Sequence, residues 1–220
     1  MKNLLSIGLA LLSLAATAQT KNNRLGVAAG GGQQFYKGDL GNGLKGEKDG
    51  TRRGTFIFQA SYYVNPSFDA GLFGAVGDLG YCQYDEVSQT PVDESQQCPG
   101  CGERVGLGNL SCRIAAGGAF VKYKFNNGYL LKENSMLQPY ILAGGALNHA
   151  MDRMKMNCVA PGNYFTLNGG AGVRYYVTKR IHLNYQLAAG YFTNDGIDFM
   201  SHGSNDMYIQ NTLLLGIDLL

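Results

Sequence analysis

The sequence predicts an all-β protein: an eight-stranded antiparallel transmembrane β-barrel preceded by a cleaved signal peptide. Three observations predict this fold. The N-terminus has the pattern of an export signal. The rest of the chain alternates apolar and polar residues with a period of two, which is the periodicity of β-strands. The connections between the expected strands alternate between short and long, as they do in membrane barrels.

The export signal covers residues 1–18. Lys2 supplies a positive charge, residues 4–16 are uncharged and rich in Leu and Ala, and Ala16-Thr17-Ala18 gives the small-x-small pattern of a cleavage site. The apolar run of about 13 residues is shorter than the ~20 that a helix needs to cross a bilayer. We therefore expect cleavage after Ala18 and a single barrel domain over 19–220.

Composition also favours a β-barrel. The 220 residues include 32 Gly, 14 Tyr and 10 Phe but no Trp and only 5 Pro, and the glycines follow no Gly-X-Y period, which excludes a collagen-like chain. No segment after the signal reaches 18 consecutive apolar residues, so we expect no transmembrane helix there. The formal net charge of +2 is too small to indicate a nucleic-acid partner.

The alternation is clearest near the C-terminal end of the chain. Between 181 and 191 the odd-numbered residues are apolar, whereas the even-numbered residues include His182, Asn184 and Gln186. One apolar face and one polar, Gly-rich face are what a strand between lipid and a polar lumen needs. The expected strands are 24–35, 55–64, 68–81, 113–125, 138–147, 165–177, 181–192 and 207–219.

The connections between these strands alternate in length. Two are three residues long, 65–67 and 178–180, and 126–137 is intermediate. The others are long: 36–54, 82–112, 148–164 and 193–206. This order, with an even number of strands, predicts short turns in the periplasm and long loops outside.

Closure of the sheet predicts a filled interior. In lipid every backbone polar group must be paired, so only an edgeless barrel can cross with strands. Eight strands leave an interior about wide enough for side chains. Because an unpaired buried charge is destabilising, we expect the titratable residues of the inner face to form a polar network that plugs the lumen. They are Lys122, Lys124, Arg174, His182 and Asp218.

Several Gly- and aromatic-rich stretches resemble outer-membrane barrels of the Bacteroidetes type. They are Tyr36-x-Gly38-Asp39-Leu40, Tyr123–Tyr129, Gln138–Gly145, Gly170–Tyr176 and Ile181–Tyr185. Over essentially the whole mature chain the sequence is similar to the N-terminal barrel domain of OmpA-like proteins. The resemblance implies an outer-membrane location. Relatives with the Tyr-x-Gly-Asp-Leu stretch include a barrel component of the type IX secretion machinery. The sequence ends directly after the last expected strand, so we expect no peptidoglycan-binding domain.

These observations predict a non-enzymatic, porin-family-like outer-membrane barrel with a structural or surface-display role. We expect a monomer in contact with outer-membrane lipid and possible contacts with other envelope proteins, and we expect no nucleic acid, cofactor or metal. Three alternatives stay open. The chain could be a subunit of a larger envelope complex such as the type IX machinery, a lipid A modifying enzyme at the membrane rim, or a soluble lipocalin-like binder.

The five cysteines are all expected in, or at the base of, the outward loops, where export permits disulfides. A Cys82–Cys112 disulfide would clamp a loop of ~30 residues and stabilise the fold by roughly 3–4 kcal/mol. A second bridge could join Cys98 or Cys101 to Cys158. The alternative for the first four is a zinc site, although their spacing matches only half of a zinc pattern. The odd count leaves at least one thiol free or joined to a partner.

Two further groups could carry chemistry in the long loops. Soft sulfur ligands in the third loop would suit Cu(I), with a projecting apolar hairpin as the alternative. The residues of that group are His149, Met151, Met154, Met156 and Cys158. In the fourth loop, Ser201 and His202 with Asp198 or Asp206 form the candidate nucleophile and base. Adjacent residues of a strand point to opposite faces, so Ser201 and His202 are poorly placed to pair.

Overall fold

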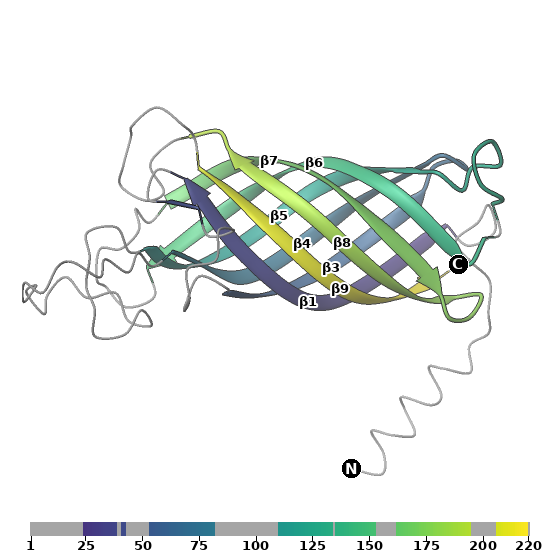
Figure 1. The fold of residues 1–220 in the computed structure, drawn as a ribbon, viewed down its shortest axis with the longest axis horizontal. Helices are drawn as coiled ribbons and strands as arrows, with labels where there is room; N and C mark the ends of the chain where they lie inside the picture. The colour runs from purple at the N-terminus through teal and green to yellow at the C-terminus, as the bar shows by residue number, and fades with distance from the viewer. Residues whose placement is uncertain are drawn as a thin grey trace, which may run out of the picture.

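The computed structural model shows a closed antiparallel barrel (Figure 1). Its wall consists of eight long strands, and the last strand pairs with the first. A two-residue strand, β2, extends the end of β1 by pairing with Lys37 and Gly38. The strands are β1 (Leu25–Gly38), β2 (Gly41–Asn42), β3 (Arg53–Tyr63), β4 (Phe68–Tyr81), β5 (Leu110–Lys124), β6 (Leu137–Asp152), β7 (Gly162–Tyr176), β8 (Ile181–Phe192) and β9 (Met207–Leu219). The eight-stranded barrel predicted from the sequence is thereby confirmed.

The structure describes most of the barrel wall. It includes residues 24–38, 41–42, 53–81, 110–133, 135–152, 162–194 and 206–219. The expected signal peptide, 1–18, lies outside these residues, as do most residues of the four long connections. Within the described ranges, no helix is long and apolar enough to span a membrane.

The register of the sheet sets the width of the barrel. Starting at Leu25 and passing from each residue to its Cα partner on the next strand leads back to β1 at Phe35, ten residues further along. This offset of ten residues around the closed sheet is the shear of the barrel. With a rise of ~3.3 Å per residue and ~4.8 Å between strands, the shear corresponds to a strand tilt of about 40° and a backbone radius of about 8 Å. Such an interior has room for side chains.

Strand ends differ from the expectation mainly at the end of the barrel with the long connections. The expected bounds of β4, β8 and β9 agree with the structure. However, β6 continues to Asp152 and β7 begins at Gly162, so the expected loop 148–164 is too long. The apolar alternation stops near Asn148, yet the backbone ladder continues through His149↔Asn163 and Ala150↔Gly162. Near the strand ends, beyond the apolar part of the outer face, outward residues can be polar while the backbones of neighbouring strands still pair.

The outer face of the wall is apolar and the inner face holds the buried side chains. Burial alternates along β8, where every even-numbered residue from His182 to Phe192 is buried. Outward residues stay exposed although they are large and apolar, as Leu72 is on β4 with 65% of its surface accessible. Outward aromatic residues lie toward both ends of the strands, including Tyr62, Phe68 and Tyr175 at one end and Phe165 and Tyr191 at the other.

Inside the barrel, large rings lie directly over glycines of neighbouring strands. An added Cβ at Gly190 would collide with the Tyr208 ring, one at Gly172 with the Tyr140 ring, and one at Gly216 with the His182 ring. A narrow barrel is filled by alternating large and small residues in this way. The glycine content of the sequence therefore makes room for the side chains that occupy the lumen.

Candidate functional site: the barrel lumen

A charged cluster occupies the lumen at the end where the short connections lie. Asp69 on β4 is fully buried, and its Oδ1 lies 2.5 Å from Nζ of Lys124 on β5. Its Oδ2 lies 3.9 Å from Nη2 of Arg174 on β7. One carboxylate thus balances two buried cations from two different strands. These three residues lie near strand ends, which is why the cluster sits at one end of the barrel.

The cluster continues from Arg174 to a second carboxylate. Nη1 of Arg174 donates a hydrogen bond of 3.2 Å to the hydroxyl of Tyr176, which in turn donates one of 2.8 Å to Oδ2 of Asp218. Nδ1 of His182 lies 3.7 Å from Oδ1 of Asp218. The rings of Tyr176 and His182 are 5.3 Å apart. Strands β4, β5, β7, β8 and β9 are therefore joined by one chain of polar contacts across the lumen.

Lys122 is held in a different way from Lys124. Its Nζ donates a 3.0 Å hydrogen bond to Oε1 of Gln59 and lies 4.6 Å from the ring centroid of Phe120 and 4.9 Å from that of Tyr140. Cation–π contacts of this kind become stronger when the cation is desolvated. Among the described residues, an amide and two aromatic rings are thus the close contacts of this ammonium group, in place of a carboxylate.

An amide layer lies in the middle of the lumen. Nε2 of Gln59 donates to Oε1 of Gln186 at 3.2 Å, and the hydroxyl of Tyr140 donates to Oδ1 of Asn184 at 2.6 Å. Further along, Gln210 donates to Oγ1 of Thr55 at 3.0 Å. A cavity of about 30 Å³ beside this layer has room for one or two water molecules. Gln59, Gln186 and Gln210 line it together with apolar residues such as Phe73, Phe120 and Leu142.

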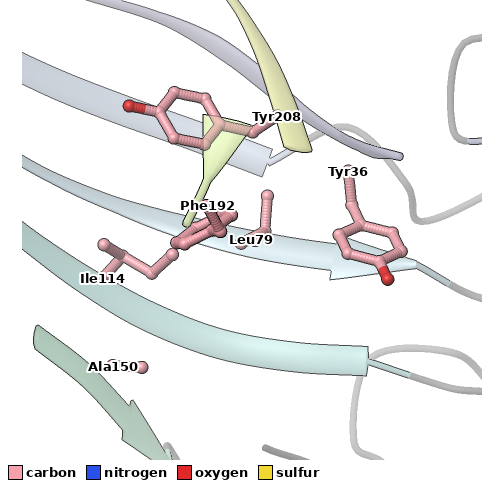
Figure 2. Packing of buried hydrophobic residues seen from close by; sticks show 6 residues of the cluster. All are labelled: Tyr36, Leu79, Ile114, Ala150, Phe192 and Tyr208. Carbon is pink, nitrogen blue, oxygen red and sulfur yellow. The ribbon is translucent and has the colours of Figure 1, made fainter. Parts of the chain in front are cut away.

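The opposite end of the lumen is filled mainly by apolar side chains. Figure 2 shows six buried residues, which come from β1, β4, β5, β6, β8 and β9. They are Tyr36, Leu79, Ile114, Ala150, Phe192 and Tyr208. The rings of Phe192 and Tyr208 meet edge to face at 5.8 Å. Tyr36 donates a 2.5 Å hydrogen bond to Oδ1 of Asp206, and both residues are fully buried. We call the six residues shown in Figure 2 the apolar cluster.

All five residues of the expected polar network are buried in the barrel: Lys122, Lys124, Arg174, His182 and Asp218. Two residues that complete the network, Asp69 and Tyr176, are absent from the expected set. Asp69 could have been found, because it alternates with the apolar Phe68 and Ala70 on an expected strand. The apolar cluster was not expected, since we assumed a polar inner face along the whole barrel.

Four of the five cysteines, Cys82, Cys98, Cys101 and Cys158, lie outside the described residues, so their pairing and the zinc alternative stay predictions. Cys112 lies within β5, which begins at Leu110, and not at the end of a loop. Its Cα partner is Leu79, three residues before Cys82. A Cys82–Cys112 disulfide would therefore require the chain to turn back directly after Tyr81, because bridged Cα atoms lie only about 4.4–6.8 Å apart.

The expected loop position of His149 and Met151 is wrong, because both lie on β6. His149 faces outward, and its Nδ1 lies 2.8 Å from Oδ1 of Asn163 on the neighbouring strand. The other members of the copper hypothesis, Met154, Met156 and Cys158, lie outside the described residues. Within the described ranges, no three His, Cys, Asp or Glu residues are grouped so that they could hold a metal ion.

One of the two aspartates proposed to assist the nucleophile and base of the fourth loop is buried in the structure. Asp206 is buried inside the barrel beneath the hydroxyl of Tyr36, so its carboxyl group does not face an exposed membrane rim. Asp198, Ser201 and His202 lie outside the described residues. A nucleophile and base there would have to rely on Asp198 to orient the histidine.

Comparison with solved structures finds the same barrel fold in another chain. The crystal structure of Neisserial surface protein A superposes with a TM-score of 0.57 at 15% identity, covering 89% of this chain and 97% of that one. The N-terminal β-barrel domain of Pseudomonas aeruginosa OprF gives a TM-score of 0.45 at 12% identity, covering 89% and 98%. No protein-family model and no curated protein matches the chain. The likeness to the first structure supports the barrel fold alone.

Proposed function

We propose that the chain is an integral protein of the bacterial outer membrane, with a structural, non-enzymatic role in which the barrel holds its long loops outward. The proposal rests on the distribution of polar and apolar residues, which is the reverse of that in a soluble protein. Charged residues such as Lys124 and Asp69 are buried inside, whereas Leu72, Phe56 and Leu215 are exposed on the outside. A soluble barrel would expose these outer residues to water, but lipid accommodates them.

The length of the connections supports one orientation. The turns at 65–67 and 178–180 lie at the same end of the barrel as the charged cluster. Short turns face the periplasm in outer-membrane barrels, and long loops face outward. In this orientation the charged cluster lies at the periplasmic end, and the apolar cluster lies beneath the surface loops.

We further propose that the lumen does not conduct. Three successive layers of side chains support this: the charged cluster, the amide layer beside a cavity of about 30 Å³, and the apolar cluster. Porins with an open aqueous channel have about 16–18 strands, whereas eight strands leave an interior that side chains can fill.

Migration in gels tests the membrane location. The protein, folded in detergent, should migrate differently before and after boiling, because a closed barrel resists unfolding by the detergent alone. It should also be recovered with the outer-membrane fraction. Recovery as a soluble periplasmic protein would contradict the proposal and favour the lipocalin-like alternative.

Two other roles, a subunit of a larger complex and an enzyme at the membrane rim, can each be tested by experiment. Stoichiometric co-purification of envelope proteins from the native membrane would indicate a subunit of a larger complex, such as the type IX machinery. An altered lipid A profile in a deletion strain, restored by the wild-type chain, would indicate a rim enzyme. The proposed structural role predicts that lipid A is unchanged in both deletion and overproducing strains.

A further inference from the structure

The connection between β5 and β6 exposes large apolar side chains although it lies beyond the end of the barrel wall (Figure 1). Tyr129 is 91% exposed, Leu130 62%, Leu131 42% and Met136 57%. The other two connections at this end, 64–67 and 177–180, each expose a single large apolar residue, Val64 or Val177, at 54%. Among the described connections, the one between β5 and β6 therefore exposes the most large apolar side chains, four against one in each of the other two.

The loop is built so that these side chains stay outside it. Oδ1 of Asn127 accepts hydrogen bonds from the backbone N–H groups of Tyr129 and Leu130 at 3.1 and 3.2 Å. Gly128 adopts a φ of 85°, which favours glycine. The backbone N–H of Leu131 donates to the carbonyl of Phe125 at 3.1 Å, closing the turn. These hydrogen bonds use polar groups of the loop, while Tyr129, Leu130 and Leu131 keep 42–91% of their surface exposed.

The loop is also joined to the outer face of the barrel wall. Nδ2 of Asn127 donates a 3.1 Å hydrogen bond to the hydroxyl of Tyr123, an outward residue of β5. The Tyr123 ring packs edge to face against Phe68 on one side and Phe125 on the other, each at 5.3 Å. A groove of about 510 Å³ lies between the loop and the β3–β4 turn, and Phe68 and Tyr129 are both among its lining residues. The exposed loop residues thus continue the aromatic end of the outer face.

We propose that this loop is a lipid anchor, which inserts Tyr129, Leu130 and Leu131 into the headgroup–acyl boundary of the leaflet next to the short turns. The proposal rests on the membrane location proposed above. Lipid is the occupant that the structure favours, because the loop is continuous with the apolar outer face and carries an aromatic residue beside two leucines. Amphipathic rings prefer the membrane interface, and leucines beside them add buried apolar area.

The absence of Trp from the sequence makes the test direct. In Tyr129→Trp, one interfacial aromatic residue replaces another, and the new indole is the sole tryptophan. Two matched single-Trp variants serve as references: Leu72→Trp on the outer face of β4, and Lys179→Trp in the β7–β8 turn at the same end. Each protein is reconstituted in phosphatidylcholine vesicles, with bromine either near the headgroup or deep in the acyl chain.

The Tyr129→Trp emission should be blue-shifted relative to Lys179→Trp and quenched more by shallow than by deep bromines. The Leu72→Trp emission should be quenched strongly by bromolipids. If Tyr129→Trp matches Lys179→Trp in emission and in quenching by aqueous acrylamide, while Leu72→Trp is still quenched by bromolipids, the anchor proposal is overturned and the loop is free for a protein partner. If bromolipids leave Leu72→Trp unquenched in a correctly folded barrel, the membrane location itself fails, and the anchor with it.

Discussion

The two ends of the lumen are filled by different chemistry within the same wall. At the end with the short turns, Asp69 and Asp218 join Lys124, Arg174 and Tyr176 through ion pairs and hydrogen bonds. At the other end, apolar side chains pack around rings, with the Tyr36–Asp206 hydrogen bond as a polar contact beside them. The outer face is apolar along both ends. The difference therefore shows that the same wall can be filled by an ionic network at one end and by apolar packing at the other.

Loss of a single carboxylate should lower the free energy of unfolding most at the charged end of the lumen. Asp69→Asn would leave Lys124 and Arg174 buried without their shared counter-charge, and breaking a buried ion pair costs about 3–5 kcal/mol. Urea unfolding in detergent micelles measures the change in the free energy of unfolding.

A matched control for that variant is Asp78→Asn. Asp78 pairs with Arg113 at 3.1 Å, but both residues are partly exposed at the outer rim of the barrel. Exposed ion pairs contribute about 0–1 kcal/mol, so this change should have little effect. Equal losses for the two variants would contradict the structural importance of the charged cluster.

The apolar end should respond less to loss of a polar group. Tyr36→Phe removes the donor to the buried carboxyl group of Asp206 and keeps the ring that packs in the apolar cluster. We expect a loss of about 2 kcal/mol, since a buried acceptor loses a partner. Tyr191→Phe, which removes an outward hydroxyl on β8, is the control and should change stability by less than about 0.5 kcal/mol. A larger loss of stability in Tyr36→Phe than in Asp69→Asn would contradict the expectation that the charged end is the more sensitive of the two.

Steric filling of the charged end should have the smallest effect. In Gly216→Ala the new methyl group would collide with the imidazole of His182, whose end can shift, so we expect a loss of about 1 kcal/mol. In Gly117→Ala, on the outer face of β5, the methyl group meets no atom within 4 Å. That variant should unfold as the wild type does, or be slightly more stable. Thermal unfolding of both variants in the same detergent compares them, and equal stability would argue against tight filling around His182.

Much of the wall could be predicted from the sequence because the apolar outer face imposes a strict alternation on each strand. The bounds of β4, β8 and β9 agree with the structure for this reason. The ends of β6 and β7 could not be found in the same way, because residues such as His149 and Asn163 lie beyond the apolar part of the outer face while their backbones still pair.

The interior could be predicted only in part. Lys122, Lys124 and Arg174 are charged residues in otherwise apolar alternating segments, so their inward position follows from the pattern. Their contacts depend on register: in the pairing of β4 with β5, Asp69 lies opposite Lys122, yet its carboxylate forms the ion pair with the diagonal Lys124. The apolar cluster leaves no signal in an alternating pattern, because inward Leu79 and Phe192 resemble the apolar residues of the outer face.

We propose that side chains fill the lumen from one end to the other. The most direct measurement is the single-channel current across planar lipid bilayers that contain the purified, folded wild-type barrel. We predict no steady conductance above that of the bare bilayer, because the charged cluster, the amide layer and the apolar cluster follow one another along the axis. A stable open channel of uniform conductance would contradict this account.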